Sequence, residues 1–200
     1  MERNEYYIKE SLKLFLKYGV KSVTIGQITQ HLNVSSKTLY QLFGDKTGLV
    51  HHCVELYRTN TAITYQELLS GAENVADALI RFYNTLVESM GLINPNFFVD
   101  VTRYFPELWD QQEAFGMQYT QELIEQGVKE GIFVEGIHIG ICAETLTLLI
   151  RSIFEKDPLS KHNAKTQTLM NNVIWPYLRG ISTPQGQEEF RKHRRQVVGA

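Results

Sequence analysis

The sequence lacks most features that mark secreted, membrane-spanning or disulfide-bonded proteins. It has only two cysteines, Cys53 and Cys142, which lie far apart and form no CxxC unit, so we expect reduced thiols and no disulfide framework. The first ten residues carry charges but no apolar core, which argues against a secretory signal. No run approaches the roughly 18 apolar residues of a membrane span, because residues such as Thr147 and Arg151 interrupt the candidates. We therefore expect a cytoplasmic protein that does not enter a membrane.

Motifs that would carry catalysis or metal binding are also missing. The sequence has no GxSxG, no phosphate-binding glycine loop, no HExxH and no paired-carboxylate motif. The adjacent His51 and His52 would project about 100° apart from a helix, so they are not expected to hold a metal together. The chain is therefore not expected to be an enzyme, and no cofactor or metal is predicted.

The charge is small overall but unevenly distributed. The whole chain has a net charge of −2. The first 50 residues hold seven Lys and Arg against four Asp and Glu, a net charge of +3, and the other 150 hold 13 against 18, a net charge of −5. A basic N-terminal segment before an acidic remainder fits a protein in which only the N-terminal part meets phosphates.

Apolar residues recur with helical spacing along most of the chain, and no stretch alternates as a half-buried strand would. The sequence therefore predicts an all-α fold. Besides a short helix ending near Phe43, the expected helices span residues 2–18, 24–32, 46–69, 73–92, 94–105, 106–130, 137–156, 162–180 and 184–195. We expect an N-terminal domain of residues 1–46 and a C-terminal domain of residues 47–200, with no flexible linker between them.

Local signals indicate where the first four helices begin and end. Gly19 and Gly44 are placed to end helices. Thr24 and Gln27 have the spacing of a Thr-x-x-Gln capping box, in which each side chain binds a free backbone N–H of the other. Asp45 can cap the fourth helix in the same manner. The boundaries around the short helices are therefore the most sharply predicted ones.

The stretch from Thr24 to Lys46 predicts a helix-turn-helix, whose second helix, capped by Ser35 or Ser36, enters the major groove of DNA. Apolar positions fix the angle between its helices: Ile25, Ile28, Leu32, Val34, Leu39 and Phe43. The outward positions of the second helix are Ser36, Lys37, Thr38, Tyr40 and Gln41. None of these is acidic, as a surface that approaches a polyanion requires. The alternative is a three-helix module used only for packing or protein contact.

The run TIGQITQHLNVSSKTLYQLFGDKTGLV resembles the signature of TetR-family DNA-binding domains, and the resemblance covers about residues 5–57. It implies that Thr24, Tyr40 and Lys46 hold phosphates. It also implies that four residues lie in or beside the major groove: Ser36, Lys37, Thr38 and Gln41. Ser35 is a further candidate for DNA contact. The sequence departs from the family pattern at Asn33, where the turn has Gly, and at Thr29, where Ala is usual. Asn tolerates the left-handed conformation that the turn needs better than most residues.

The C-terminal helices carry more apolar residues than a single core needs. TetR-like proteins pair their last two long helices with those of a second subunit, so the resemblance implies a homodimer with a four-helix interface. The interface residues expected on that basis are Leu146, Ile150, Ile153, Val173 and Tyr177. A dimer would also place two reading helices on successive major grooves, about 34–36 Å apart. The alternative is an ordinary monomer core.

The middle helices are rich in aromatic and thioether side chains, which are typical of pockets for drug-sized ligands. TetR-like proteins bind an effector inside this bundle. The candidate effector-binding residues are Tyr83, Met90, Phe98, Tyr104, Trp109 and Tyr119. The alternative is that these rings simply fill the core.

Together these features predict a ligand-responsive transcriptional regulator. As a dimer it would bind a palindromic double-stranded operator, act as a repressor and be released by a small-molecule effector. One alternative is a constitutive or activating DNA-binding regulator without an effector. The other is a helical enzyme or a partner-binding protein.

Overall fold

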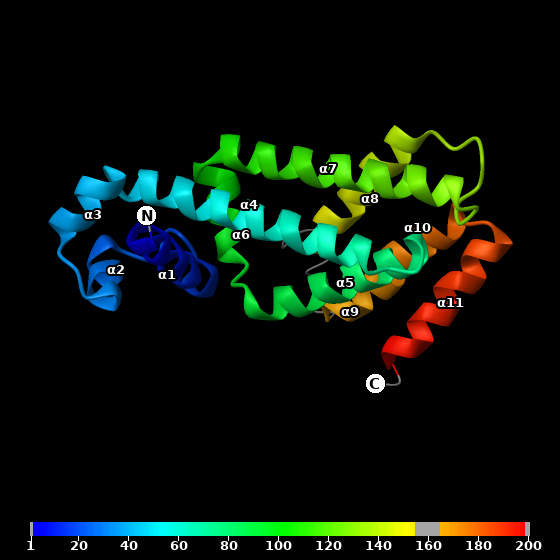
Figure 1. Ribbon diagram of the computed structural model, residues 1–200, viewed down its shortest axis with the longest axis horizontal. Helices are drawn as coiled ribbons and strands as arrows, with labels where there is room; N and C mark the ends of the chain where they lie inside the picture. The colour runs from blue at the N-terminus through cyan, green and yellow to red at the C-terminus, as the bar shows by residue number, and fades with distance from the viewer. Residues whose placement is uncertain (1, 155–164, 199–200) are drawn as a thin grey trace. The chain divides into compact units, whose positions relative to one another are not determined.

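The computed structural model describes residues 2–154 and 165–198 (Figure 1). Its helices are α1 (Glu2–Tyr18), α2 (Ile25–Leu32), α3 (Ser36–Phe43), α4 (Lys46–Ser70), α5 (Val75–Leu92), α6 (Asn96–Tyr104), α7 (Pro106–Lys129), α8 (Ile139–Phe154), α9 (Thr166–Leu169), the π-helix η2 (Met170–Ile174), α10 (Trp175–Gly180) and α11 (Pro184–Val198). The described part contains no strand, only an isolated antiparallel bridge between Phe133 and Ser182. The predicted all-α class is confirmed.

The predicted helix boundaries agree with the structure to within a few residues, except over 162–180. Residues 155–156 and 162–164 of the predicted helices lie outside the described part of the chain, and the helix that follows is not a continuous α-helix. It begins at Thr166 and passes through the π-helical segment η2 before α10. Pro176 is the second residue after η2, in the first turn of α10. Because proline has no backbone N–H, the regular i→i−4 hydrogen bonding cannot continue through this position, and the local register changes.

The chain groups into two compact units, and α4, α5 and α7 each run from one unit into the other. Unit 1 comprises residues 1–64 and 89–112, and unit 2 comprises residues 65–88 and 113–200. The division into residues 1–46 and 47–200 remains a prediction about which part binds DNA. The packing places the first part of α4 and the whole of α6 with the N-terminal helices.

Unit 1 is built around the apolar faces of α1–α4 and α6. Phe15 of α1, Ile28 of α2, Leu39 of α3 and Leu49 of α4 are almost completely buried in one cluster, which Phe97 of α6 joins. Burying a side chain of this size stabilises a fold by about 1.5–3 kcal/mol relative to leaving it exposed. This cluster therefore holds the two short helices against α1 and α4.

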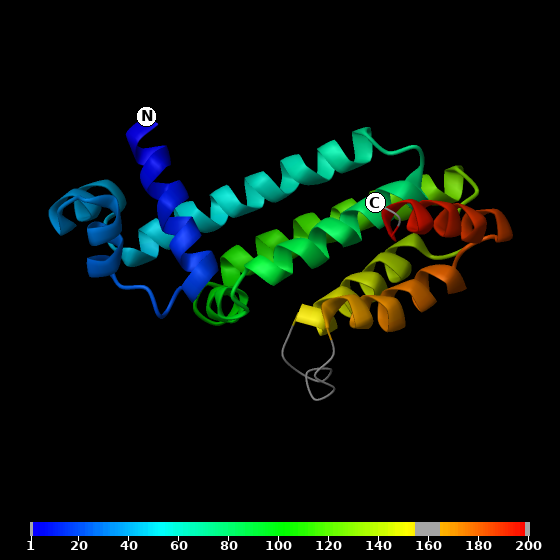
Figure 2. The same ribbon diagram turned by 90° about the horizontal axis from the view of Figure 1, so that it is seen from below.

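Unit 2 has its own core, formed mainly by α5, the later part of α7, α8, α10 and α11. Figure 2 shows α8 beside the segment formed by η2 and α10. Ile124 of α7, Leu146 of α8 and Leu178 of α10 are buried there, and Phe190 brings α11 onto the same cluster. None of the described helices is both long and apolar enough to cross a bilayer.

Candidate nucleic-acid interface

The start of α2 is organised by the capping box that the sequence predicts. The Thr24 hydroxyl accepts a hydrogen bond from the Gln27 backbone N–H at 3.2 Å, and the Gln27 side chain accepts one from the Thr24 backbone N–H at 2.8 Å. Thr24 is exposed. The first turn of α2 therefore presents its remaining backbone N–H groups to solvent, which is the arrangement that binds phosphate oxygens.

The turn between α2 and α3 depends on a residue in the left-handed conformation. Asn33 has φ 53° and ψ 48°, and its N–H points back to the last carbonyls of α2. This confirms the expectation that Asn serves here. Thr29 is buried, and its hydroxyl donates to the Gly26 carbonyl within α2 at 2.9 Å. The extra hydroxyl is thus accommodated inside its own helix.

Helix α3 buries one face and exposes the face expected to read DNA. Ser35 caps it by accepting a hydrogen bond from the Thr38 N–H at 3.1 Å. Leu39 and Phe43 are buried. Of the outward residues expected from the sequence, Thr38 is half-buried, and the exposed ones are Ser36, Lys37, Tyr40 and Gln41. α3 has no acidic residue, so nothing on it repels a phosphate backbone.

The junction between α3 and α4 is close-packed. Gly44 ends α3 with φ 76°, and Asp45 caps α4 by accepting a hydrogen bond from the Gly48 N–H at 2.8 Å. A Cβ on Gly48 would collide with the carbonyl oxygen of Phe43, so only glycine allows α4 to start this close to α3. The start of α4 is therefore held in a fixed direction relative to α3.

Lys46, expected to hold a phosphate, is half-buried and already has a partner. Its Nζ donates to the carbonyl oxygen of Val20 at 2.6 Å. Burial lowers the pKa of Lys46, while the charge of Asp100 acts in the opposite direction. The phosphate contact stays a prediction, and it requires this ammonium to turn away from Val20.

Two long-range contacts, one on the α1–α2 turn and one near the end of α1, were not predicted from the sequence. The Asp100 carboxylate on α6 accepts a hydrogen bond from the Lys21 backbone N–H at 2.7 Å across a separation of 79 residues. Just before α6, the Asn94 N–H donates to the carbonyl of Leu16, near the end of α1, at 2.7 Å. No local pattern relates residues so far apart in sequence, so nothing in the sequence pointed to these pairs.

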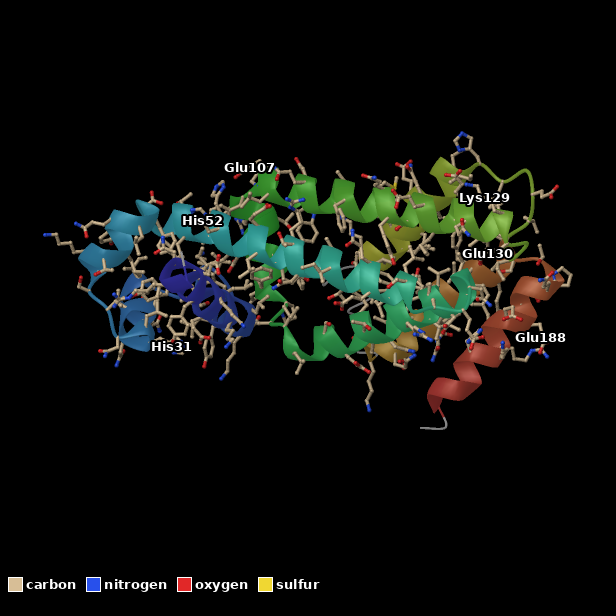
Figure 3. The ribbon with its side chains drawn as sticks, viewed as in Figure 1. His31, His52, Glu107, Lys129, Glu130 and Glu188 are labelled. Carbon is tan, nitrogen blue, oxygen red and sulfur yellow. The ribbon has the colours of Figure 1, made fainter. Side chains whose placement is uncertain are left out.

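Carboxylates near the helix-turn-helix are neutralised by neighbours. Glu10 of α1 accepts a hydrogen bond from Lys13 at 2.6 Å and lies 3.2 Å from the Nε2 of His31. Figure 3 labels His31 on α2. Hydrogen bonds from Lys13 and His31 hold the pKa of Glu10 below its usual value. The neighbouring lysines on the exposed side of α1, Lys9 and Lys17, keep this part of unit 1 basic.

The two adjacent histidines on α4 have different neighbours. His51 lies 3.5 Å from the carboxylate of Glu107 and packs edge-on against Phe105. His52 packs edge-on against Phe43. In Figure 3 the labelled His52 and Glu107 lie on α4 and α7 respectively. The side chains of His51 and His52 thus pack within unit 1 against different partners.

The candidate effector-binding residues do not form one group. Tyr83 and Tyr119 belong to the core of unit 2, whereas Phe98 and Trp109 pack against each other in unit 1. Tyr104 is 46% exposed, and its ring forms cation–π contacts with the Lys21 ammonium and the Arg103 guanidinium. Tyr104 stays a predicted effector residue, although its surface position is unlike the lining of an interior pocket. The Met90 side chain lies outside the described residues.

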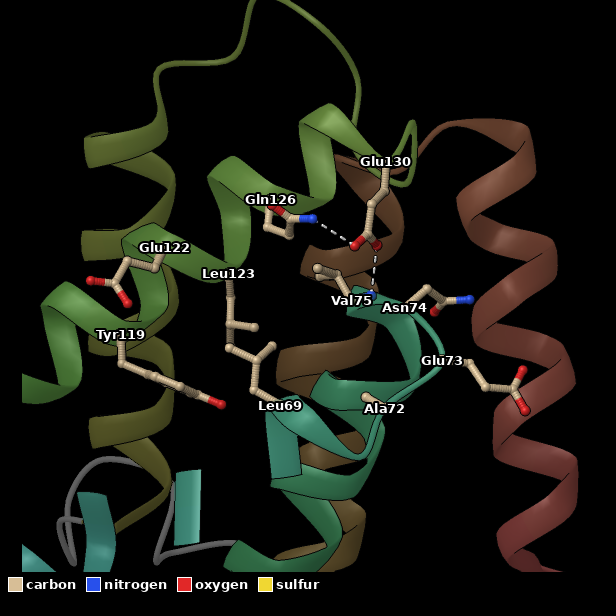
Figure 4. Close-up of a pocket in the computed structure, with 10 residues that line it drawn as sticks. All are labelled: Leu69, Ala72, Glu73, Asn74, Val75, Tyr119, Glu122, Leu123, Gln126 and Glu130. Atoms are coloured by element: carbon tan, nitrogen blue, oxygen red, sulfur yellow. Dashed lines mark hydrogen bonds between the residues drawn. The ribbon is translucent and has the colours of Figure 1, made fainter. Parts of the chain in front are cut away.

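Unit 2 contains a cavity of about 380 Å³ between the end of α4, the start of α5 and the later part of α7 (Figure 4). Its lining includes Leu69, Leu123 and Tyr119 on the apolar side. On the polar side, Glu130 accepts hydrogen bonds from the Val75 backbone N–H at 2.8 Å and from Gln126 at 2.9 Å. Of the effector candidates, Tyr119 contributes to this lining, and its hydroxyl donates to the carbonyl of Tyr65.

The residues expected at a dimer interface differ in how far they are available to a partner. Leu146 and Ile153 are 1% and 8% exposed, because they face the core of unit 2 itself. Both stay predicted interface residues, although in one protomer their side chains pack into its own core. Ile150, Val173 and Tyr177 are half-buried, and the Tyr177 hydroxyl donates to the carbonyl of Cys142 at 2.9 Å.

Comparisons with known proteins agree with this geometry. Residues 8–53 match the family model of bacterial regulatory proteins, tetR family. A transcriptional regulator from Cytophaga hutchinsonii, 15% identical, superposes with a TM-score of 0.74 over 92% of this chain and 100% of that one. A TetR-family transcriptional regulator from Agrobacterium tumefaciens, 14% identical, gives 0.73 over 91% and 98%. Reduced NemR from E. coli, also 14% identical, gives 0.75 over 92% and 98%. These likenesses show a shared fold. Among curated proteins, none matches the chain.

Proposed function

We propose that this chain, whose residues 8–53 match the tetR family model, is a DNA-binding transcriptional regulator of the TetR type and that α3 reads a palindromic operator in the major groove. The observation that carries the proposal is the exposed face of α3, which has hydroxyl, amine and amide groups and no carboxylate. It lies between two helix starts that can receive phosphates. The protein would work in the cytoplasm, where its DNA is.

The proposed contacts divide by role. Lys37 and Gln41, with Ser36 and Thr38, reach base edges, and hydrogen bonds in the major groove distinguish the base pairs. The phosphate contacts come from Thr24 and Tyr40, both exposed in the structure, and the exposed Ser35 is a further DNA contact. Lys46, also expected on a phosphate, would first have to leave the Val20 carbonyl. Phosphate contacts position the helix and carry no direct sequence information.

A homodimer through α8 and the segment of η2 and α10 fits the exposed apolar side chains of unit 2. On α8, Ile141 and Leu148 are 59% and 54% exposed and stand seven residues apart, so they share one face of the helix. We add these two to Ile150, Val173 and Tyr177 in the proposed interface. Two exposed apolar residues on one face, beside three half-buried ones, form a surface that a second copy can cover.

The dimer is tested by Leu148→Glu in sedimentation velocity. A buried carboxylate at the interface should shift the protein from dimer to monomer at micromolar concentration, because an unpaired charge is costly to desolvate. The matched control is Leu92→Glu in unit 1, since Leu92 is 82% exposed and outside the proposed interface. If the Leu148→Glu variant stays dimeric, the interface lies elsewhere.

An effector site in unit 2 is supported by an unsatisfied buried group. The Tyr83 hydroxyl is buried and has no hydrogen-bond partner among the described residues. Burial raises the pKa of Tyr83, so the hydroxyl keeps its proton and remains a donor. The ring packs edge-on against Trp175 and Phe82. A small apolar molecule with a hydrogen-bond acceptor would satisfy this donor.

Effector binding would release the operator only if the ligand prefers the conformation that does not bind DNA. A coupling free energy of about 1–3 kcal/mol changes the affinity for the operator by about fivefold to a hundredfold. On this proposal the protein is a repressor in the absence of the effector. A constitutive or activating regulator would keep its DNA whatever small molecule is added.

Selection of duplexes from a random-sequence pool by the full chain tests the central proposal. We expect enrichment of one palindromic sequence, with half-sites about one helical turn apart, bound far more tightly than random duplex. Equal and weak binding to all duplexes would overturn the proposal and favour a partner-binding protein. A library of small molecules, screened for release of the selected duplex from wild type and from Tyr83→Phe, tests the effector site.

A further inference from the structure

The α1–α2 turn is held by one peptide group that is bound at both ends. The carbonyl oxygen of Val20 accepts a hydrogen bond from the Lys46 ammonium at 2.6 Å. The next N–H, that of Lys21, donates to the Asp100 carboxylate at 2.7 Å. These two backbone groups belong to the same peptide bond, which is planar and rigid. The Lys46 ammonium on α4 and the Asp100 carboxylate on α6 thus bind the two ends of one planar peptide group.

This peptide has no helical partners of its own. It follows Gly19, whose φ of 85° ends α1, and precedes the Thr24 cap of α2. Buried backbone polar groups need partners, and these two obtain theirs from side chains rather than from a helix. Val20 and Val23 are buried in the core of unit 1 and anchor the turn on both sides of the exposed Lys21 and Ser22.

The grip on the anionic side is itself buried. Asp100 is 7% exposed and lies against Gly19, where a Cβ would come within 3.2 Å of its Oδ2. The Lys21 side chain reaches the same helix, with its Nζ 5.8 Å from the centre of the Tyr104 ring. α6 therefore holds Lys21 by both its backbone and its side chain.

We infer that Asp100 is a positioning residue for DNA binding: together with Lys46 it clamps the Val20–Lys21 peptide and so fixes where α2 begins. The inference rests on the proposed DNA contacts, since the phosphate-binding start of α2 lies three residues after this peptide. Lys46 acts through the peptide in this arrangement. Neither residue needs to touch DNA for its loss to weaken binding.

Amide hydrogen exchange of the full chain tests the clamp without DNA. In Asp100→Ala the Lys21 and Gln27 amides should exchange at least about tenfold faster, whereas the amides of α3 are unchanged. Asp100→Asn keeps an oxygen that can accept the Lys21 N–H, so it should retain most of the protection at Lys21. The matched control is Thr102→Ala, because Thr102 is exposed on the same helix and its hydroxyl donates to the Phe98 carbonyl within that helix. Unchanged exchange of Lys21 and Gln27 in Asp100→Ala overturns the clamp.

Binding to the duplex selected by wild type tests the positioning role, at a temperature where circular dichroism shows every variant folded. Asp100→Ala and Lys46→Met should each weaken binding by about tenfold. Because both act on one peptide, the double variant should lose little more than the worse single variant. If Lys46 stays on the Val20 carbonyl when DNA is bound, both variants should leave the salt dependence of binding unchanged, since in that arrangement neither side chain contacts a phosphate.

The contrary results are equally specific. Asp100→Ala that binds within twofold of wild type overturns the positioning role. If the two losses multiply in the double variant and only Lys46→Met reduces the salt slope, Lys46 does not act through the peptide. Lys46 then contacts a DNA phosphate directly. If selection enriches no duplex, the proposed function fails, and hydrogen exchange still decides whether the clamp exists.

Discussion

His193 on α11 faces Asp77 on α5, with 3.5 Å between the imidazole Nδ1 and the carboxylate Oδ1, and both side chains are buried. The same carboxylate accepts hydrogen bonds from Arg81 at 2.9 Å and from the Glu73 backbone N–H at 3.0 Å. Glu189 lies 3.4 Å from the other imidazole nitrogen. A single buried carboxylate thus connects the start of α5 with the C-terminal helix of unit 2.

Replacing Asp77 by Asn should destabilise the protein near neutral pH. An amide cannot accept all of these charge-assisted hydrogen bonds, so we expect a loss of about 1–3 kcal/mol in the free energy of unfolding. Urea unfolding monitored by circular dichroism measures it. The control is Glu125→Gln, since Glu125 forms an exposed ion pair with Lys129, of a kind that contributes little.

The effect of Asp77→Asn should shrink in acid. Burial alone would raise the pKa of Asp77, but hydrogen bonds from Arg81 and the Glu73 N–H outweigh it and hold the pKa below its ordinary value. A carboxyl with a depressed folded pKa stabilises the fold above its unfolded pKa of about 3.9 and loses that contribution as pH falls through the folded value. The difference in unfolding free energy between wild type and variant should be constant above about pH 5 and smaller below about pH 4. A difference independent of pH would show that the charge is not what matters.

Asn33→Gly should stabilise the turn between α2 and α3. Asn33 has φ 53°, where glycine has no Cβ penalty, and we expect a gain of up to about 1 kcal/mol. Asn33→Val should cost more than this gain, because a β-branched residue is a true outlier there. Thermal unfolding of the three proteins should give melting temperatures in the order Gly, Asn, Val. A valine variant as stable as wild type would contradict the left-handed turn.

Gly48→Ala should disrupt the junction of α3 and α4. The alanine Cβ would collide with the Phe43 carbonyl, so either the two helices separate or the turn rearranges. Either change should lower the free energy of unfolding by several times the usual effect of a surface substitution. Gly26→Ala is the matched control. Gly26 is exposed within α2 and has room for a Cβ, so alanine there should stabilise by about 1 kcal/mol. Chemical unfolding should therefore give opposite signs for the two substitutions, and equal signs would contradict the close approach.

Base-reading and phosphate-binding side chains should respond differently to substitution. Gln41→Ala should change which base pairs are selected and cost about 1–3 kcal/mol at the contacted position. Tyr40→Phe removes a hydroxyl expected on a phosphate, so it should weaken binding to all duplexes alike. Repeating the duplex selection with each variant separates the two outcomes. A Gln41→Ala variant with the wild-type preference would mean that α3 is turned differently on DNA.

The local parts of the interface could be predicted because each depends on residues a few positions apart. The Thr24 and Gln27 cap, the left-handed Asn33 and the Asp45 cap of α4 all follow from short-range hydrogen bonding. The exposed face of α3 follows from helical periodicity in the same way. For the expected dimer residues Leu146 and Ile153, the sequence could not show which surface they pack against. An apolar residue at helical spacing packs equally well in its own core or in a partner's.

The sequence by itself determined which segments are helices, where the short ones begin and end, and which side of α3 is free of acids, because these depend on neighbours along the chain. Only the tertiary structure decided that Lys46 turns inward to Val20, that Asp100 of α6 grips the following N–H, and that Tyr104 lies on the surface. Such contacts join residues 26 and 79 positions apart. They depend on how packed helices bring distant residues together, which no local pattern of residue types encodes.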